Sequence, residues 1–275
     1  MISTRAADPT QARRFRAAYG QHRAAEGRGA GGVDELLALP FLRRGPFAKS
    51  WRVRARTFER FVTAVLDVRA AEVRGRMVQV ADLGAGNGWL CYRLALHGHA
   101  AIAVDIRDDT GDGLAAASIY ADHLPTMFPR IVGSFEAVPL ADRSCDIVVF
   151  NAALHYALDL RAALTEAARI VMGGGRIVIL DSPFYAREAD GSAMVEEKQR
   201  AASALFGALA DDLMALPLIE FLTPVRLADA SPATVMAWRR HRVRYPLWYE
   251  ARPLLAWLRR KRAPSRFDLW EASVQ

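Results

Sequence analysis

The sequence predicts an α/β protein with a doubly wound, Rossmann-like sheet of seven mostly parallel strands. Apolar stretches of strand length alternate with helical patterns from residue 77 to residue 180. A glycine-rich turn at 84–88 joins the first strand to the helix that follows it, and two further strand patterns end the chain. Helices between successive strands require parallel strands joined by right-handed crossovers, so these three observations together favour the doubly wound class.

Length and composition set bounds on the class of protein. A chain of 275 residues, 52% of them hydrophobic, is long enough for one large α/β domain with an added subdomain. No run of about eighteen apolar residues is present, so no membrane span is predicted. The first residues lack the apolar segment of a secretory signal. The net charge of +7 permits an acidic substrate or a nucleic acid as partner without establishing either one.

The two cysteines, Cys91 and Cys145, fall on a predicted helix and a predicted strand. We expect both to be reduced core residues, which is typical of a cytoplasmic protein. No cluster of cysteine and histidine has the spacing of zinc ligands, and no metal site is predicted.

Residues 1–75 precede the strand–helix alternation and are predicted to form a helical extension. The apolar spacing predicts an amphipathic helix over 8–25, a short helix over 33–39, and a long helix that runs from an N-cap at Ser50 to about Val73. Two interpretations of this extension stay open. It covers the ligand site as a lid, or it packs on one face of the sheet.

Residues 76–275 are predicted to form the main domain. The expected strands cover 77–82, 100–105, 131–132, 145–150, 176–180, 238–245 and 266–274. The expected helices cover 89–97, 113–120, 160–171, 226–230 and 248–260. A helical insertion is predicted after the fifth strand, at about 184–217, and it ends at a proline.

The glycine-rich turn predicts a ligand site, and its spacing restricts the ligand. A dinucleotide site needs the pattern G-x-G-x-x-G. Here Gly84, Gly86 and Gly88 alternate, and Trp89 stands where the third glycine of that pattern belongs. A pyrophosphate site is therefore disfavoured. Glycine at these positions lets another molecule approach the backbone closely.

Asp82-Leu83-Gly84-Ala85-Gly86-Asn87-Gly88 resembles motif I of the class I S-adenosylmethionine (SAM)-dependent methyltransferases. The resemblance extends closely over 75–182 and more loosely over 219–275. It implies the class I methyltransferase fold, SAM as cofactor and S-adenosylhomocysteine as product. It further implies that Gly84, Ala85, Gly86 and Gly88 lie beside the methionine part of SAM, and that Asp82 holds the ligand's ammonium group through water. A carboxylate that only braces the loop is the other interpretation of Asp82.

Asp105 ends the second predicted strand and is followed by Ile106. A carboxylate at this position accepts hydrogen bonds from two vicinal ribose hydroxyls. Ile106 is then expected to pack on the adenine ring. A solvated acid at a strand end is the other interpretation.

Two further segments resemble parts of the family's SAM site. Residues 133–140 resemble a segment whose aspartate contacts the adenine amino group, and Ser134 stands in its place. The resemblance implies an adenine contact by Ser134 and by the Phe135 backbone, with Glu136 as an alternative to Ser134. Asn151 ends the fourth predicted strand, where its backbone carbonyl is expected to meet the SAM amino group.

Four side chains that follow the fourth and fifth strands are candidates for activating a methyl acceptor: His155, Tyr156, Asp181 and Tyr185. His155 is the preferred general base because its ordinary pKa lies near neutrality. We therefore assign His155 and Tyr156 as the catalytic candidates. The other interpretation is that both residues line the pocket or cap the next helix.

These observations favour a SAM-dependent methyltransferase that acts on an O, N or C nucleophile of a small-molecule acceptor, in bacterial secondary metabolism. An RNA or protein methyltransferase is the alternative, and a SAM-fold protein with a non-methylating or purely binding role is another. Nucleic acid is the less favoured partner, because the basic clusters 239–244 and 259–262 have structural explanations at an edge strand and a helix end. The sequence identifies neither the acceptor nor the oligomeric state.

Overall fold

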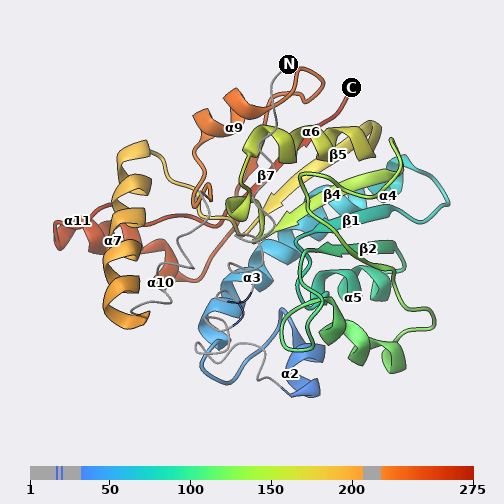
Figure 1. Cartoon of the computed structure of the whole chain (residues 1–275), viewed down its shortest axis with the longest axis horizontal. Coiled ribbons are helices and arrows are strands. Elements are labelled where there is room, and N and C mark those ends of the chain that lie inside the picture. Colours follow the sequence, from blue (N-terminus) through green and yellow to red (C-terminus); the bar gives the residue numbers. More distant parts are fainter. Residues whose placement is uncertain (1–16, 18–19, 21–31, 207–217) are drawn as a thin grey trace.

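The computed structural model describes residues 17, 20, 32–206 and 218–275. Its centre is a seven-stranded sheet with the strand order β3-β2-β1-β4-β5-β7-β6 (Figure 1). Strands β1 to β5 are parallel, and β7 runs antiparallel to both of its neighbours. This sheet confirms the predicted class. Apart from residues 17 and 20, the helix predicted over 8–25 lies outside the described residues, as does the end of the predicted insertion.

The strands are β1 Gln79–Leu83, β2 Ala100–Asp105, β3 Arg130–Val132, β4 Cys145–Asn151, β5 Val171–Leu180, β6 Arg239–His241 and β7 Leu269–Ser273. The α-helices are α2 Val33–Ala38, α3 Ala48–Phe61, α4 Asp67–Glu72, α5 Trp89–Leu96, α6 Leu160–Ile170, α7 Glu188–Phe206, α9 Pro224–Ala230, α10 Leu247–Glu250 and α11 Arg252–Leu258. One π-helix, η1 Val62–Leu66, and two 3₁₀-helices, η2 Leu114–His123 and η3 Leu154–Tyr156, complete the described elements.

Alternating side chains of the central strands build a core on each face of the sheet. Val80 and Ile147 belong to the cluster that includes residues of α3 and α5, whereas Ala81 and Val148 belong to the cluster under α6 and α9. The period of two along each strand produces this division. Figure 1 shows α3 and α5 on one side of the sheet and α6 and α9 on the other.

The long N-terminal helix starts earlier than the sequence predicts. Helix α3 begins at Ala48, and the Ser50 hydroxyl donates to the Phe47 carbonyl at 2.8 Å instead of capping the helix. A π-helical turn, η1, then joins α3 to α4, so that one helical rod runs from Ala48 to Glu72. Its apolar side is buried under the sheet, with Phe61 and Leu66 fully inaccessible to solvent.

The fifth strand begins earlier than the predicted residue 176, because the glycines before that residue belong to the strand. Strand β5 begins at Val171, and its pairing with β4 shifts between Cys145 and Ile147. Gly175 lies at this irregularity, where an added Cβ would come within 2.6 Å of the Asp146 carbonyl oxygen. Glycine is required because the backbones approach too closely for a side chain.

The last part of the chain is more broken than predicted. The sixth strand covers only Arg239–His241, and the helix predicted over 248–260 is two short helices, α10 and α11. Pro253 lies in the first turn of α11, a position that proline favours because its missing N–H is not needed there.

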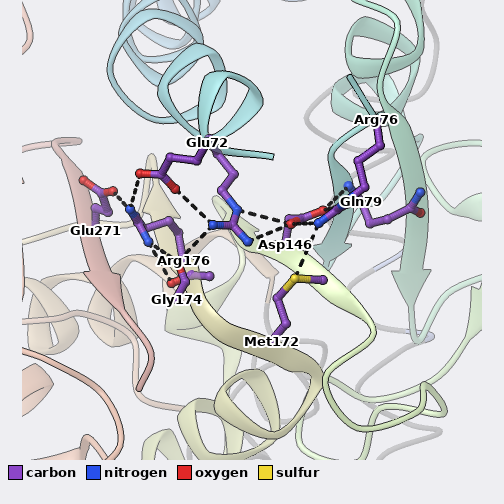
Figure 2. A network of polar contacts seen from close by, with 10 residues as sticks. Glu72, Arg76, Gln79, Asp146, Met172, Gly174, Arg176 and Glu271 are labelled. Carbon is purple, nitrogen blue, oxygen red and sulfur yellow. Dashed lines mark hydrogen bonds and ion pairs between the residues drawn. The ribbon is translucent and has the colours of Figure 1, made fainter. Parts of the chain in front are cut away.

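A network of charges fastens the helical rod to the end of the sheet where β1 and β4 begin (Figure 2). The side chain of Asp146 is fully buried and accepts hydrogen bonds from Arg69 of α4 at 2.9 and 3.2 Å. Arg76 donates to both oxygens of the same carboxylate at 2.6 and 2.7 Å, and the Gln79 N–H donates at 2.9 Å. The nearby cations and donors hold the pKa of Asp146 below its ordinary value against the effect of burial.

The same network continues to the antiparallel edge. Arg69 also pairs with Glu72 at 3.0 Å. Arg176 of β5 contacts Glu72 at 2.9 Å and Glu271 of β7 at 3.1 Å. The network therefore joins α4, β1, β4, β5 and β7 and fixes the position of the helical rod on the sheet.

We predict that Asp146→Ala lowers the free energy of unfolding by about 3–5 kcal/mol, because removal of a buried carboxylate leaves its arginine partners uncompensated. Chemical denaturation measures this. Asp142→Ala is the matched control: its side chain is 74% exposed and pairs with Arg169, so we expect a loss below about 1 kcal/mol. Equal losses for the two variants would contradict a central role for the network.

Candidate functional site

The glycine loop after β1 has already used most of its backbone donors. The N–H groups of Gly84 and Ala85 donate to the Val104 carbonyl at 2.8 and 3.0 Å. Gly86 donates to the Asp105 carboxylate at 2.8 Å, and Gly88 donates to the Ala85 carbonyl at 2.9 Å. A phosphate needs such donors to be unused. The loop therefore offers close contact with its backbone and no array of donors for an anion.

Within the glycine loop, Gly84 is the position where a side chain is excluded most clearly. Its φ is +82°, and an added Cβ would lie 2.4 Å from the Cβ of Ala153. Both the left-handed backbone and the contact require glycine. The loop can thus pass close beneath the end of β4.

One cavity of about 790 Å³ opens at the carboxyl ends of the parallel strands. Its volume lies within the range of small-molecule sites, about 300–1,000 Å³. The loop after β1 and the ends of β2, β4 and β5 form one side, and residues of α3 and of the C-terminal segment form the other. Its lining comprises Pro46, Phe47, Lys49, Ser50, Trp51, Val53, Arg54, Gly84, Ala85, Gly86, Asn87, Trp89, Asp105, Ile106, Arg107, Asp112, Phe135, Asn151, Ala152, Ala153, His155, Tyr156, Asp181, Pro183, Trp248, Tyr249, Arg252 and Phe267.

The structure brings most of the residues predicted from the sequence to this one cavity. The predicted residues that line it are Gly84, Ala85, Gly86, Asp105, Ile106, Phe135, Asn151, His155 and Tyr156. Asp82, Gly88 and Ser134 are not among the lining residues. Asp82 is fully buried behind the loop, and Gly88 packs against Phe128 at the start of α5.

Neither Ser134 nor its alternative Glu136 is among the residues that line the cavity. The Ser134 hydroxyl accepts from the Glu136 N–H at 3.1 Å and closes a local turn. The Glu136 carboxylate accepts from the N–H groups of Leu158 and Asp159. Both side chains support the backbone around the site, and only Phe135 of this segment lines the cavity.

Asp105 is held in a fixed orientation at the end of β2. One carboxylate oxygen accepts from the Gly86 N–H and the other from the Arg107 N–H, each at 2.8 Å. Burial raises the pKa of Asp105, and these two donors oppose the rise. Each oxygen keeps lone-pair capacity. The carboxylate can therefore accept from a pair of hydroxyls that enter the cavity.

Several buried oxygen atoms of the site have no hydrogen-bond partner among the described residues. They are Asp82 Oδ1, Asn151 Oδ1 and Asp181 Oδ1, and the last two belong to residues that line the cavity. Burial, and then the charge of Asp105, raise the pKa of Asp82 well above its ordinary value. Unpaired acceptors and crowded carboxyl groups suit a ligand that carries positive charge and donates hydrogen bonds. The amino group and sulfonium of SAM have these properties, so the residues present fit SAM.

The carboxyl ends of β4 and β5 carry backbone strain. Ala152 and Asp181 have φ values of +53° and +52°, which residues other than glycine rarely adopt. The two positions are neighbours, because Asn151 pairs with Leu180 and the Ala152 N–H donates to the Leu180 carbonyl. Strained residues of this kind concentrate at functional sites. Both residues line the cavity.

The pKa of Asp181 is raised and the pKa of His155 is lowered from their ordinary values. Burial raises the pKa of Asp181 to about 6, although the Arg54 charge and the Thr57 hydroxyl oppose the rise. Burial, and then the charges of Lys198 and Arg54, lower the pKa of His155 to about 3. At neutral pH His155 is therefore an uncharged and weak base. Asp181 titrates close to neutrality, which suits a general base better than His155 does.

Sequence reasoning missed the residues of α3 in the wall opposite the strand ends. Lys49 and Arg54 of α3 line the cavity, as do Trp248, Tyr249 and Arg252 of the C-terminal helices. The Lys49 ammonium lies 4.5 Å from the centre of the Trp248 ring, a cation–π contact between segments some two hundred residues apart. The mixture of basic and aromatic residues was visible in the sequence, but no local pattern places them together.

The described residues include no group of three or more His, Cys, Asp or Glu side chains arranged to hold a metal ion. Within the same part of the chain, no helix combines the length and apolar character needed to cross a bilayer.

Known proteins resemble this chain in sequence around the site. Residues 81–179 match the family model for a methyltransferase domain. An uncharacterised methyltransferase of Mycobacterium tuberculosis is 38% identical over 99 residues, which cover 36% of this chain and 37% of that protein. The uncharacterised methyltransferase YcgJ of Bacillus subtilis is 32% identical over 124 residues, which cover 45% of this chain and 47% of YcgJ. The chain thus spans less than half of the length of these curated relatives.

The crystal structure of YcgJ also has a similar fold. It matches 76% of this chain and 97% of its own, with a TM-score of 0.50 and 17% sequence identity. At this identity the similarity shows the fold alone.

The sheet order, its antiparallel end and the glycine loop define an α/β domain of the class I methyltransferase type. Residues 81–179 match the methyltransferase domain family, and the unpaired acceptors of the site fit SAM as its cofactor.

We predict that Asp105→Ala weakens the binding of S-adenosylhomocysteine by about 10–100-fold, because hydrogen bonds to a fixed carboxylate contribute roughly 1.5–3 kcal/mol. Titration calorimetry measures the dissociation constant. Asp108→Ala, at an exposed position three residues further along the chain, is the control and should bind as the wild type does. Unchanged binding by Asp105→Ala would assign Asp105 a role in bracing the loop only.

Proposed function

We propose that this chain transfers the methyl group of SAM to a small-molecule acceptor, and that Asp181 is the general base that prepares the acceptor's nucleophile. One observation carries this proposal. The cofactor residues and the strained ends of β4 and β5 line a single cavity. A cofactor and an acceptor bound there are next to each other, without a rearrangement of the fold.

The division of the cavity supports the proposed roles. Bound SAM supplies a methyl group on an already activated sulfonium. The chain then has to orient the acceptor, exclude water and remove a proton from a hydroxyl or ammonium nucleophile. Asn151 and Asp105 lie on the cofactor side. Asp181 ends β5 beside the end of β4, where it can accept the acceptor's proton.

We assign His155 and Tyr156 to orienting the acceptor. Their rings lie 4.1 Å apart at an angle of 39° and line the cavity next to Asp181. His155 Nδ1 lies 3.4 Å from the Ser182 hydroxyl. An uncharged imidazole at this position can form a hydrogen bond with the substrate that receives the methyl group. It does not compete with Asp181 for that substrate's proton.

The extension over 1–75 is proposed to complete the acceptor side. Among its described residues, those that line the cavity lie in 46–54. Thr57 lies 3.2 Å from the Tyr245 hydroxyl and so joins α3 to the C-terminal segment. These contacts support a cover over the acceptor, which excludes water from the transfer. A role in bacterial secondary metabolism stays a prediction of the sequence.

The proposal is tested with SAM that carries a tritiated methyl group. The protein is incubated with labelled SAM and, separately, with a filtered small-molecule extract of bacterial cells and with the retained macromolecules. We expect label to appear in the small-molecule fraction. Label found only in macromolecules would support an RNA or protein acceptor instead. Absence of SAM binding by calorimetry would contradict the proposal entirely.

We predict that Asp181→Asn lowers the rate of label transfer by about 10²–10⁴-fold, the usual contribution of a general base. Wild-type transfer should rise with pH through about 6, where Asp181 loses its proton. Calorimetry on the variant should show unchanged affinity for S-adenosylhomocysteine. If His155→Gln removes the pH dependence and Asp181→Asn does not, the base assignment is wrong.

The same substitution should stabilise the fold. The ordinary pKa of an aspartate is 3.8, and in the folded protein the pKa of Asp181 is about 6. The folded state therefore disfavours the ionised form, and the penalty is complete above pH 6. We expect Asp181→Asn to raise the free energy of unfolding at pH 8 by about 1–3 kcal/mol. Denaturation at lower pH should show this difference narrowing towards pH 4.

A further inference from the structure

Helix α11 presents its apolar side to solvent. Leu254, Leu255, Trp257 and Leu258 are 59%, 45%, 73% and 62% exposed. At about 100° per residue these four side chains occupy one arc of roughly 160°. Ala256 falls on the opposite side and is half-buried. Surface helices of globular proteins normally bury such an apolar arc against the core. In α11 the apolar arc instead faces solvent.

The preceding helix carries a further exposed apolar side chain. Leu247 in α10 is 88% exposed, the largest value among the exposed large hydrophobic residues of the described chain. Figure 1 shows α11 at the edge of the molecule, away from the sheet. Single exposed apolar side chains are common, but five on two adjacent short helices mark an interaction surface.

The positive charge of the chain is concentrated in the sequence segment that contains α10 and α11. Residues 239–262 contain nine arginine and lysine residues and one acid, Glu250, whereas the whole chain carries a net charge of +7. The rest of the chain is thus close to neutral. Within the described part of the chain, five exposed cations of this segment take part in no ion pair: Arg242, Arg244, Arg259, Arg260 and Lys261.

Three of these cations directly continue α11. The Arg259 N–H donates to the Leu255 carbonyl at 3.2 Å, and the Lys261 N–H donates to the Ala256 carbonyl at 2.9 Å. The basic end is therefore folded against the last turn of the helix and borders its apolar arc. Cations at a helix C-terminus complement the helix dipole, but the dipole gives no reason for exposed leucine and tryptophan side chains beside them.

We propose that α11 docks on an anionic lipid surface. Leucine and tryptophan side chains enter the boundary between headgroups and acyl chains, and bordering arginine and lysine side chains meet the lipid phosphates. A second copy of the chain is disfavoured as the occupant, because a twofold contact would bring the same cations together. This contact goes beyond the proposed methyl transfer and does not depend on it.

Flotation of the full chain with vesicles tests the proposal. We expect it to float with vesicles of phosphatidylcholine and phosphatidylglycerol, and not with phosphatidylcholine alone or at high salt. W257S/L258S and R259Q/R260Q/K261Q should each weaken binding by at least about tenfold. All five substituted side chains are exposed, so circular dichroism and thermal unfolding of both variants should match the wild type.

Two control variants separate the surface from general changes in polarity or charge. Val225→Ser removes an exposed apolar side chain from α9, where Val225 is 67% exposed. R43Q/R44Q/R60Q removes three exposed cations elsewhere. Both should float as the wild type does. A wild type that does not float with anionic vesicles overturns the proposal, as does W257S/L258S floating unchanged. A dimer that only W257S/L258S disrupts, without flotation of the wild type, would assign the surface to self-association and also overturn it.

Discussion

The buried carboxylate of Asp146 fixes the position of the helical rod on the sheet, and through the rod it positions one wall of the distant cavity. It lies at the beginning of β4, and two arginines and one backbone N–H surround it. A buried carboxylate is tolerated only with partners of this kind. One partner, Arg69, belongs to the helical rod whose other end, Lys49 to Arg54, forms a wall of the cavity. The ion pair at one end of the sheet therefore sets the shape of the site at the other end.

The site itself combines three carboxyl groups with a loop that has few donors left. Asp82, Asp105 and Asp181 all have pKa values raised by burial. No anion would reduce this crowding of acids, whereas a cationic ligand does. Gly84 supplies close approach, and its N–H is already bonded to Val104. The spacing of the glycines and the bonded N–H groups of the loop thus disfavour a phosphate at the loop for independent reasons.

The sequence predicted those parts of the fold and site that depend on local pattern. The strand, glycine loop and helix at 79–96 and the acid at the end of β2 are continuous in the chain, so their periodicity and spacing were sufficient. The position of Ser134 outside the cavity lining, where its hydroxyl closes a local turn, could not be read from the sequence. The low pKa of His155 results from burial beside Lys198 and Arg54, which come from distant segments. No local pattern carries information about such packing.

The wall that faces Asp181 and the surface of α11 are parts of one structure. Arg252 begins α11, lines the cavity, and places its guanidinium 4.5 Å from the centre of the Tyr249 ring. The Tyr249 hydroxyl in turn accepts from the Phe267 N–H at 2.8 Å, just before β7. Close-packed groups of this kind move together. A contact that holds the outer side of α11 therefore also holds the aromatic wall of the cavity, because the same helix carries Leu254 outward and Arg252 inward.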